Sequence, residues 1–174
     1  MESLNSYISL NRKNGAPTVS ADARIEELGI DLSQPSSPIA NYVPCVRVGN
    51  LLFLSGNGPR RGGSNEMVTG KLGRDLSVEE GYEAARLVGI QLLAAIKNEL
   101  GTLDAVERCV KALGMVNGTP DFTSQPAVIN GFSDLMVEVF GENGKHARSA
   151  VGMGSLPNGI AVEIELIVQL KDDA

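Results

Sequence analysis

Apolar residues recur at helical spacing in two long stretches of the chain. The first opens with a capping box at residues 77–80, carries apolar or small residues every three or four positions from Tyr82 to Leu100, and is followed by Gly101. The second follows Pro126, a residue that suits the first turn of a helix, and its apolar stripe covers residues 128–140. The pattern therefore predicts two amphipathic helices.

Five shorter segments are typical of strands. Val43–Val48 and Leu51–Ser55 flank Gly49-Asn50, a two-residue hairpin turn. The other three predicted strands are Val106–Val116, Ala147–Met153 and Ala161–Leu170. We interpret the last two, which residues 156–159 connect, as a hairpin. The resulting order ββαβαββ predicts an α+β fold built on one sheet.

The last predicted strand has two unlike faces. One face is continuously apolar and can be covered by the two helices: Val162, Ile164, Leu166 and Val168. The other face is half apolar and half charged or polar: Ala161, Glu163, Glu165, Ile167 and Gln169. Because two helices of this length cannot cover both faces of a sheet, the second face suits a subunit interface with a lined cleft. A solvated outer face is the alternative.

The first 38 residues differ from the rest of the chain. Residues 1–19 are polar, Ser20–Leu28 can form a short helix capped by Ser20 and stopped by Gly29, and residues 34–38 form a Pro/Ser linker. We expect an extension over residues 1–38 and one domain over residues 39–174. The start lacks the apolar segment of a secretory signal, so the cytoplasm is the default location. Arg12-Lys13 leaves an organellar transit peptide open.

Composition and charge limit the partners. With 43% hydrophobic but only 4% aromatic residues, the core must be aliphatic. The formal net charge is −6 and the only basic cluster is Arg60-Arg61, whereas nucleic-acid binders concentrate Lys and Arg. No apolar run reaches the ~20 residues of a membrane-spanning helix. We therefore expect a soluble protein with neither a membrane nor a nucleic acid as partner.

Most catalytic templates fail on this sequence. One histidine, His146, and two isolated cysteines, Cys45 and Cys109, cannot assemble a standard zinc site, so we expect no metal or organic cofactor and interpret the cysteines as buried free thiols. The glycine-rich segment 56–63 lacks the Lys-Ser/Thr of a phosphate loop, and no serine lies in a nucleophile elbow. Any catalysis should therefore use water.

One charged position suits ligand binding. Arg148 lies on a predicted strand, on the same side as Ala150 and Gly152. Small neighbours leave space beside a guanidinium, whose two parallel donors match a carboxylate. The alternative is a structural cross-strand ion pair between Arg148 and Glu163.

Two sequence blocks carry a family resemblance. Residues 41–42 (Asn-Tyr) and 49–56 (Gly-Asn-Leu-Leu-Phe-Leu-Ser-Gly), with Ala-Arg-Ser-Ala-Val at 147–151, Leu-Pro at 156–157 and Val-Glu-Ile-Glu at 162–165, resemble the RidA/YjgF family of reactive-intermediate deaminases, also labelled endoribonuclease L-PSP-like. The likeness covers about Tyr42 to Val168. The extension, together with the segments 70–73 and 125–131, is similar to a divergent subgroup.

The resemblance implies a fold, an assembly and a site. The fold would be chorismate-mutase-like, assembled as a homotrimer with clefts between subunits. Arg148 would clamp the carboxylate of an imine or enamine, Glu163 would position a water, and four further residues would line the site: Tyr42, Ser55, Gly56 and Asn130. The chain departs from the family at three places. Ala150 stands where a Cys is common, and Gly152 stands where a Glu is common. Val43-Pro44 replaces residues of the Ser-Gln type.

These expectations rank three functions. The first is metal-free hydrolytic deamination of small 2-imino or enamino acids to 2-keto acids and ammonia. The second is a non-catalytic trimer that binds carboxylate metabolites on the same scaffold. The third is a ribonuclease or translation-inhibitor activity, which the charge of −6 does not favour.

Overall fold

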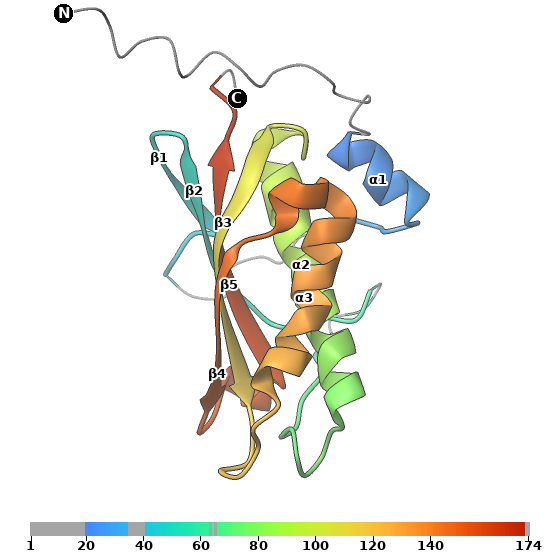
Figure 1. The fold of residues 1–174 in the computed structure, drawn as a ribbon, viewed down its shortest axis with the longest axis vertical. Coiled ribbons are helices and arrows are strands. Elements are labelled where there is room, and N and C mark those ends of the chain that lie inside the picture. Colours follow the sequence, from blue (N-terminus) through green and yellow to red (C-terminus); the bar gives the residue numbers. More distant parts are fainter. Residues whose placement is uncertain (1–19, 35–40, 63, 65, 173–174) are drawn as a thin grey trace, which may run out of the picture.

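One five-stranded sheet with two long helices on one face forms the centre of the computed structural model (Figure 1). The structure describes residues 20–34, 41–62, 64 and 66–172. The helices are α1 (Ala21–Glu27), α2 (Val78–Leu100) and α3 (Gln125–Phe140), with short 3-10 turns η1 (Gly141–Gly144) and η2 (Pro157–Gly159). The strands are β1 (Cys45–Val48), β2 (Leu51–Asn57), β3 (Val106–Asn117), β4 (Ala147–Met153) and β5 (Val162–Leu170). The predicted ββαβαββ order is confirmed from β1 to β5.

Local signals in the sequence set the ends of these elements. The Ser77 side chain accepts a hydrogen bond from the backbone N–H of Glu80, whose carboxylate accepts one from the Ser77 N–H, so the capping box of α2 is complete. Gly101 ends α2 in the left-handed region at φ 77°. Gly49, at φ 60°, makes the turn between β1 and β2.

The strand order is β1-β2-β5-β3-β4, with β3 and β4 parallel and the other pairs antiparallel. The interpretation of β4 and β5 as a hairpin is therefore wrong, because β3 lies between them. The α3 crossover returns the chain parallel to β3 on its free edge, and residues 154–161 then carry it past β3 to the opposite side.

The helix-covered face of the sheet is the core. Val162, Ile164 and Val168 are fully buried and Leu166 is 1% exposed, as the apolar face of the last strand predicted. Figure 1 shows α2 and α3 on this side and no helix on the other. Ala161 departs from the prediction, since it precedes β5 and is buried in the same core.

The short helix α1 packs onto this core. Its cap is the predicted one, with the Ser20 side chain accepting from the N–H of Ala23. Ile25 is buried, and Asp22 accepts from Lys97 at 3.1 Å at the end of α2. Part of the expected N-terminal extension thus contacts the domain. Residues 1–19 and 35–40, which include most of the expected linker and the domain start near residue 39, lie outside the described residues.

Candidate functional site

Arg148 of β4 is held against the first half of α3. Its Nη1 donates to Asn130 Oδ1 at 2.9 Å and to Ser133 Oγ at 3.0 Å. Its Nη2 points to the carbonyl oxygen of Pro126 at 3.4 Å. Asn130 and Ser133 are three positions apart and so share one face of α3. We call Arg148, Asn130 and Ser133 the arginine cluster.

The neighbours of Arg148 leave less space than the sequence suggested. Arg148 pairs with Ala112 of β3, and Ala150 pairs with Gly114, so small residues do surround it. At Gly152, however, an added Cβ would lie 2.9 Å from Nε2 of Gln125, whose amide donates to the carbonyl of Phe122 at 2.7 Å. The Gln125 side chain therefore occupies the space over Gly152.

Ser133 also contacts the single histidine of the chain. His146 Nε2 lies 3.2 Å from Ser133 Oγ, and His146 Nδ1 lies 2.7 Å from the carbonyl oxygen of Gly144. Phe132 packs edge-on against the imidazole at 5.4 Å between ring centroids. Burial, and then the nearby charges of Arg148 and Lys111, lower the pKa of His146 in spite of its bond to Gly144. The ring is consequently neutral near pH 7.

A second group of predicted site residues lies on β2 and on the segments beside it. Gly56 lies directly beside Glu163, because a Cβ on Gly56 would be 2.2 Å from Glu163 Oε1. The Ser55 hydroxyl donates to the carbonyl of Val43 at 2.7 Å, next to the exposed Tyr42. A register shift between Leu54 and Asn57 makes Ser55 and Gly56 a local irregularity of the sheet. We call Tyr42, Ser55, Gly56 and Glu163 the glutamate cluster.

Glu163 is a half-buried carboxylic acid without a stabilising partner. Its carboxylate makes no hydrogen bond or ion pair with any residue that the structure describes. Burial, followed by repulsion from Glu165, raises the pKa of Glu163 above its usual range. A carboxyl group with a raised pKa can both accept and return a proton near neutral pH.

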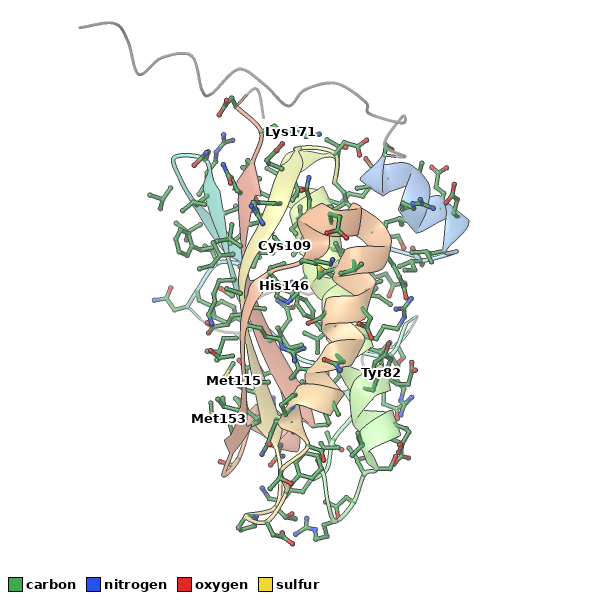
Figure 2. The ribbon with its side chains drawn as sticks, in the orientation of Figure 1. Tyr82, Cys109, Met115, His146, Met153 and Lys171 are labelled. Carbon is green, nitrogen blue, oxygen red and sulfur yellow. The ribbon has the colours of Figure 1, made fainter. Side chains whose placement is uncertain are left out.

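The two clusters do not meet within one chain. On β3, Met115 pairs with Glu163 and Ala112 with Leu166, and these two β3 positions differ by three residues, so their side chains point to opposite faces. Arg148, the other partner of Ala112, faces α3, whereas Glu163 faces the open side with Met115, which Figure 2 shows away from the helices. Since β3 also separates β4 from β5, two strand spacings of ~5 Å each lie between them. The alternative of an Arg148–Glu163 pair inside one subunit is therefore wrong.

The open face of the sheet is rich in exposed apolar side chains. Phe53, on β2, is 40% exposed and pairs with Val46, which is 52% exposed. Other large apolar residues exposed on or next to this face are Tyr42, Val43, Val48 and Val151. Exposed apolar side chains concentrated on one face are typical of a protein–protein contact.

The described part of the chain offers neither a reactive thiol nor a cluster of metal ligands. Both cysteines are free, and burial raises the pKa of Cys109 to about 12 and that of Cys45 to about 11, so neither is a thiolate at neutral pH. Among residues 20–34, 41–62, 64 and 66–172, no three His, Cys, Asp or Glu side chains come together as metal ligands. Within the same residues no helix has the length and apolarity to cross a membrane.

Ser133 and His146 were not predicted as neighbours of Arg148. Two spacings could have revealed them. Ser133 is one helical turn from Asn130, and His146 is two positions before Arg148, hence on the same side of an extended segment. His146 was considered only as a metal ligand or a member of a serine-hydrolase triad.

Comparisons with known proteins identify a matching family and similar relatives. A model of the family described as "YjgF/chorismate mutase-like, putative endoribonuclease" matches residues 22–169. Protein TCP17 of Trypanosoma cruzi is 44% identical over 86% of this chain and 94% of its own length. A 2-iminobutanoate/2-iminopropanoate deaminase of Dermatophagoides farinae is 33% identical over 77% of this chain and 89% of its own length.

Solved structures share the fold. The crystal structure of Atu1372 from Agrobacterium tumefaciens is 42% identical, with a TM-score of 0.77, over 87% of this chain and 92% of that one. A Shewanella oneidensis protein described as a "putative endoribonuclease" is 30% identical, with a TM-score of 0.83, over 87% of this chain and 100% of that one.

Proposed function

The chain belongs to the YjgF/chorismate mutase-like family, and from that premise we propose that it hydrolyses small 2-imino or enamino acids to 2-keto acids and ammonia. The proposed site is a cleft between subunits of a homotrimer and uses neither a metal nor an organic cofactor. A relative 33% identical to this chain is named for the deamination of 2-iminobutanoate and 2-iminopropanoate, which supports this substrate class.

The observation that carries the proposal is the separation of the two clusters. The arginine cluster lies at the β4–α3 side of the sheet, and the glutamate cluster lies at β2–β5 on the open face. Two complementary patches on different surfaces of one subunit form a head-to-tail contact, which closes into a ring when the rotation allows it. In a ring of three, Arg148 of one subunit would face Glu163 of the next.

The chemistry follows from these groups. Arg148 would hold the carboxylate of the imino acid, fixing the C=N carbon in the cleft. Glu163 would accept a proton from a water molecule as its oxygen bonds to that carbon, and would pass the proton to the nitrogen. The hydroxyl proton of the resulting carbinolamine then passes to the nitrogen as the C–N bond breaks, so that ammonia leaves and the carbon becomes the carbonyl of the 2-keto acid.

Binding without catalysis is the second candidate, since Gly152 stands where the resemblance implies a Glu. The amide of Gln125 lies over Gly152, so a neutral group occupies the position of a possible acid. Such a protein would retain carboxylate affinity at Arg148 and lack turnover. The names of some relatives suggest ribonuclease activity, but this chain has no concentration of positive charge of the kind that binds RNA.

Ammonia release from freshly generated 2-iminobutanoate tests the proposal. We expect wild type to accelerate release over buffer, and both Arg148→Ala and Glu163→Gln to lose most of the acceleration. Prolonged EDTA treatment should leave the rate unchanged; loss with EDTA and recovery with zinc would overturn the metal-free mechanism. Wild type that binds 2-oxobutanoate but does not accelerate release would establish the binding function instead. RNA cleavage that depends on Arg148 would favour the ribonuclease.

A further inference from the structure

A chain of hydrogen bonds leads from Arg148 back to the end of η1. It links the Gly144 carbonyl to His146 Nδ1 at 2.7 Å, His146 Nε2 to Ser133 Oγ at 3.2 Å, and Ser133 Oγ to Arg148 Nη1 at 3.0 Å. Its members come from η1, the residue before β4, α3 and β4. We propose that His146 is a positioning residue, which fixes the Arg148 clamp through the Ser133 hydroxyl. The inference rests on the proposed function of Arg148 as a carboxylate clamp.

The partner of Nδ1 determines the tautomer of His146. A carbonyl oxygen only accepts hydrogen bonds, so Nδ1 must carry the proton that bonds to Gly144. In a neutral imidazole Nε2 then presents a lone pair toward Ser133. The Gly144 carbonyl thus makes His146 an acceptor at the end that faces the arginine cluster.

The acceptor at Nε2 determines the direction of the Ser133 hydroxyl. Ser133 has one O–H donor, and the Nε2 lone pair takes it. The oxygen lone pairs of Ser133 then remain for Arg148, which has only donors. All three bonds run in one direction, and each donor has an acceptor.

The charges around His146 preserve the neutral ring. Among the described residues, the charges that act on it are those of Arg148 on β4 and Lys111 on β3, both positive. The residues that contact it from α3 and η1, namely Phe132, Ser133 and Gly144, are uncharged. A protonated ring would add a third positive charge and would turn Nε2 into a donor. The arrangement therefore favours the neutral Nδ1–H tautomer.

Packing holds the ring in place independently of these bonds. Phe132 contacts the imidazole edge-on and is fully buried in the core. A phenyl ring at position 146 would retain that packing and lose both nitrogens. His146→Phe therefore separates the role of the hydrogen bonds from that of the ring volume, and Ser133→Ala removes the link itself. Ser133→Thr is the conservative control, because it keeps the hydroxyl.

Nitrogen-15 NMR and ligand titration test the proposal together. His146 is the single histidine, so its imidazole signals need no assignment by mutation. We expect the Nδ1–H tautomer, mostly neutral at about pH 6.5, where an unperturbed histidine is half protonated, with an Nε2 shift that changes in Ser133→Ala. The Kd for 2-oxobutanoate should rise about tenfold, the equivalent of one hydrogen bond, in His146→Phe and in Ser133→Ala.

The ligand affinity of the double variant distinguishes a positioning role from a merely structural one. His146→Phe with Ser133→Ala should weaken binding no more than either change alone, because both break the same link. Ser133→Thr should recover most of the affinity that Ser133→Ala loses, because it keeps the hydroxyl, and melting temperatures should stay close to wild type. An Nε2–H tautomer, or unchanged affinity in both single variants, would overturn the inference.

The same titration separates this inference from the proposed function. Wild type that binds 2-oxobutanoate without releasing ammonia from the imine would contradict the deaminase and leave the positioning role intact. Wild type that deaminates while both single variants match it would contradict the positioning role alone. Wild type that neither binds 2-oxobutanoate nor accelerates ammonia release from the imine would overturn both.

Discussion

The two clusters differ at the residue scale in how their charged groups are supported. Arg148 is the supported one, since the side chains of Asn130 and Ser133 both accept from one guanidinium nitrogen. We predict that Arg148→Lys loses roughly 2–4 kcal/mol of 2-oxobutanoate binding, because an ammonium cannot bond Asn130, Ser133 and a carboxylate in one plane. Calorimetric titration measures the loss. Arg61→Lys, at an exposed loop arginine, is the matched control.

Fold and assembly should survive the Arg148→Lys change, which melting temperature and solution mass would check. A lysine variant that binds 2-oxobutanoate as tightly as wild type would end the clamp hypothesis. The alternative role of Arg148, an ion pair with Glu163 within one subunit, is excluded because the two side chains point to opposite faces of the sheet.

Glu163 is the unsupported group, and its pKa shift predicts a stability effect. A raised pKa means that the folded chain favours the neutral acid, so the associated stability is complete at low pH and is lost as pH rises through the raised pKa. In the isolated subunit, to which this shift applies, Glu163→Gln stays neutral and should therefore melt at a higher temperature than the unsubstituted subunit at pH 7.5; in the assembled protein it should lose deamination.

The difference in melting temperature should shrink as pH falls toward the ordinary range of a glutamic acid. Glu26→Gln, at an exposed glutamate of α1, should show no comparable gain at any pH and is the control. A Glu163→Gln protein less stable than wild type at pH 7.5 would mean that the folded protein stabilises the charged form.

At the element scale, the contact of α2 with α3 depends on a glycine. A Cβ at Gly131 would lie 2.0 Å from the backbone carbonyl oxygen of Tyr82, and backbone cannot yield as a flexible side chain does. We predict that Gly131→Ala costs at least ~1–3 kcal/mol of unfolding free energy in spite of the better helix propensity of alanine. Denaturant unfolding measures it, with Gly154→Ala, where a Cβ meets nothing within 4 Å, as the control.

Because Asn130 precedes Gly131 on α3, the same change should also displace an acceptor of Arg148. We expect 2-oxobutanoate affinity and stability to fall together in Gly131→Ala and neither to fall in Gly154→Ala. Equal stability of the two variants would show that α3 can shift away from α2 without cost.

The elements were predictable because their signals are local. The capping box at Ser77, the left-handed glycines Gly49 and Gly101, and the stripe before Gly141 each act over a few residues, and the structure has the corresponding ends. The partner of each strand is harder to predict from the sequence, because pairing depends on which distant segments meet in space. Nothing near β4 in the sequence distinguishes pairing with β5 from parallel pairing with β3.

The same limit applies to the site. Sequence and family resemblance selected Arg148, Asn130 and the residues of the glutamate cluster, and the structure brings Arg148 to Asn130 and Glu163 to Gly56. The face on which each cluster lies depends on strand register, which a sequence fixes only through the whole sheet. Ser133 and His146 were missed because their contact joins α3 to the start of β4 across the crossover.

At the scale of the whole molecule, the open face predicts self-association. Phe53 is 40% exposed in the isolated chain and lies among other apolar residues on the face that no helix covers (Figure 1). We predict a solution mass three times the 18.3 kDa of the chain at micromolar concentration. Phe53→Asp should shift the mass to the monomer and abolish turnover, because it would bury a charge in the interface.

Val137→Asp is the matched control for that change. Val137 is similarly exposed, at 37%, but lies on α3, which covers the opposite face of the sheet. Its replacement should leave mass and turnover unchanged. A wild-type chain that stays monomeric would remove the proposed cleft, since the two clusters would then have no means of meeting.

Mixing two inactive variants tests whether one site takes residues from two subunits. Arg148→Ala chains keep Glu163, and Glu163→Gln chains keep Arg148, so each alone lacks one half of every cleft. In a ring of three formed by refolding an equal mixture, a cleft is complete only where an Arg148 of one chain type faces a Glu163 of the other. Random assembly makes about one cleft in four complete, so about a quarter of wild-type deamination should return. A site contained within one subunit would give no recovery at any mixing ratio, because no chain in the mixture carries both residues.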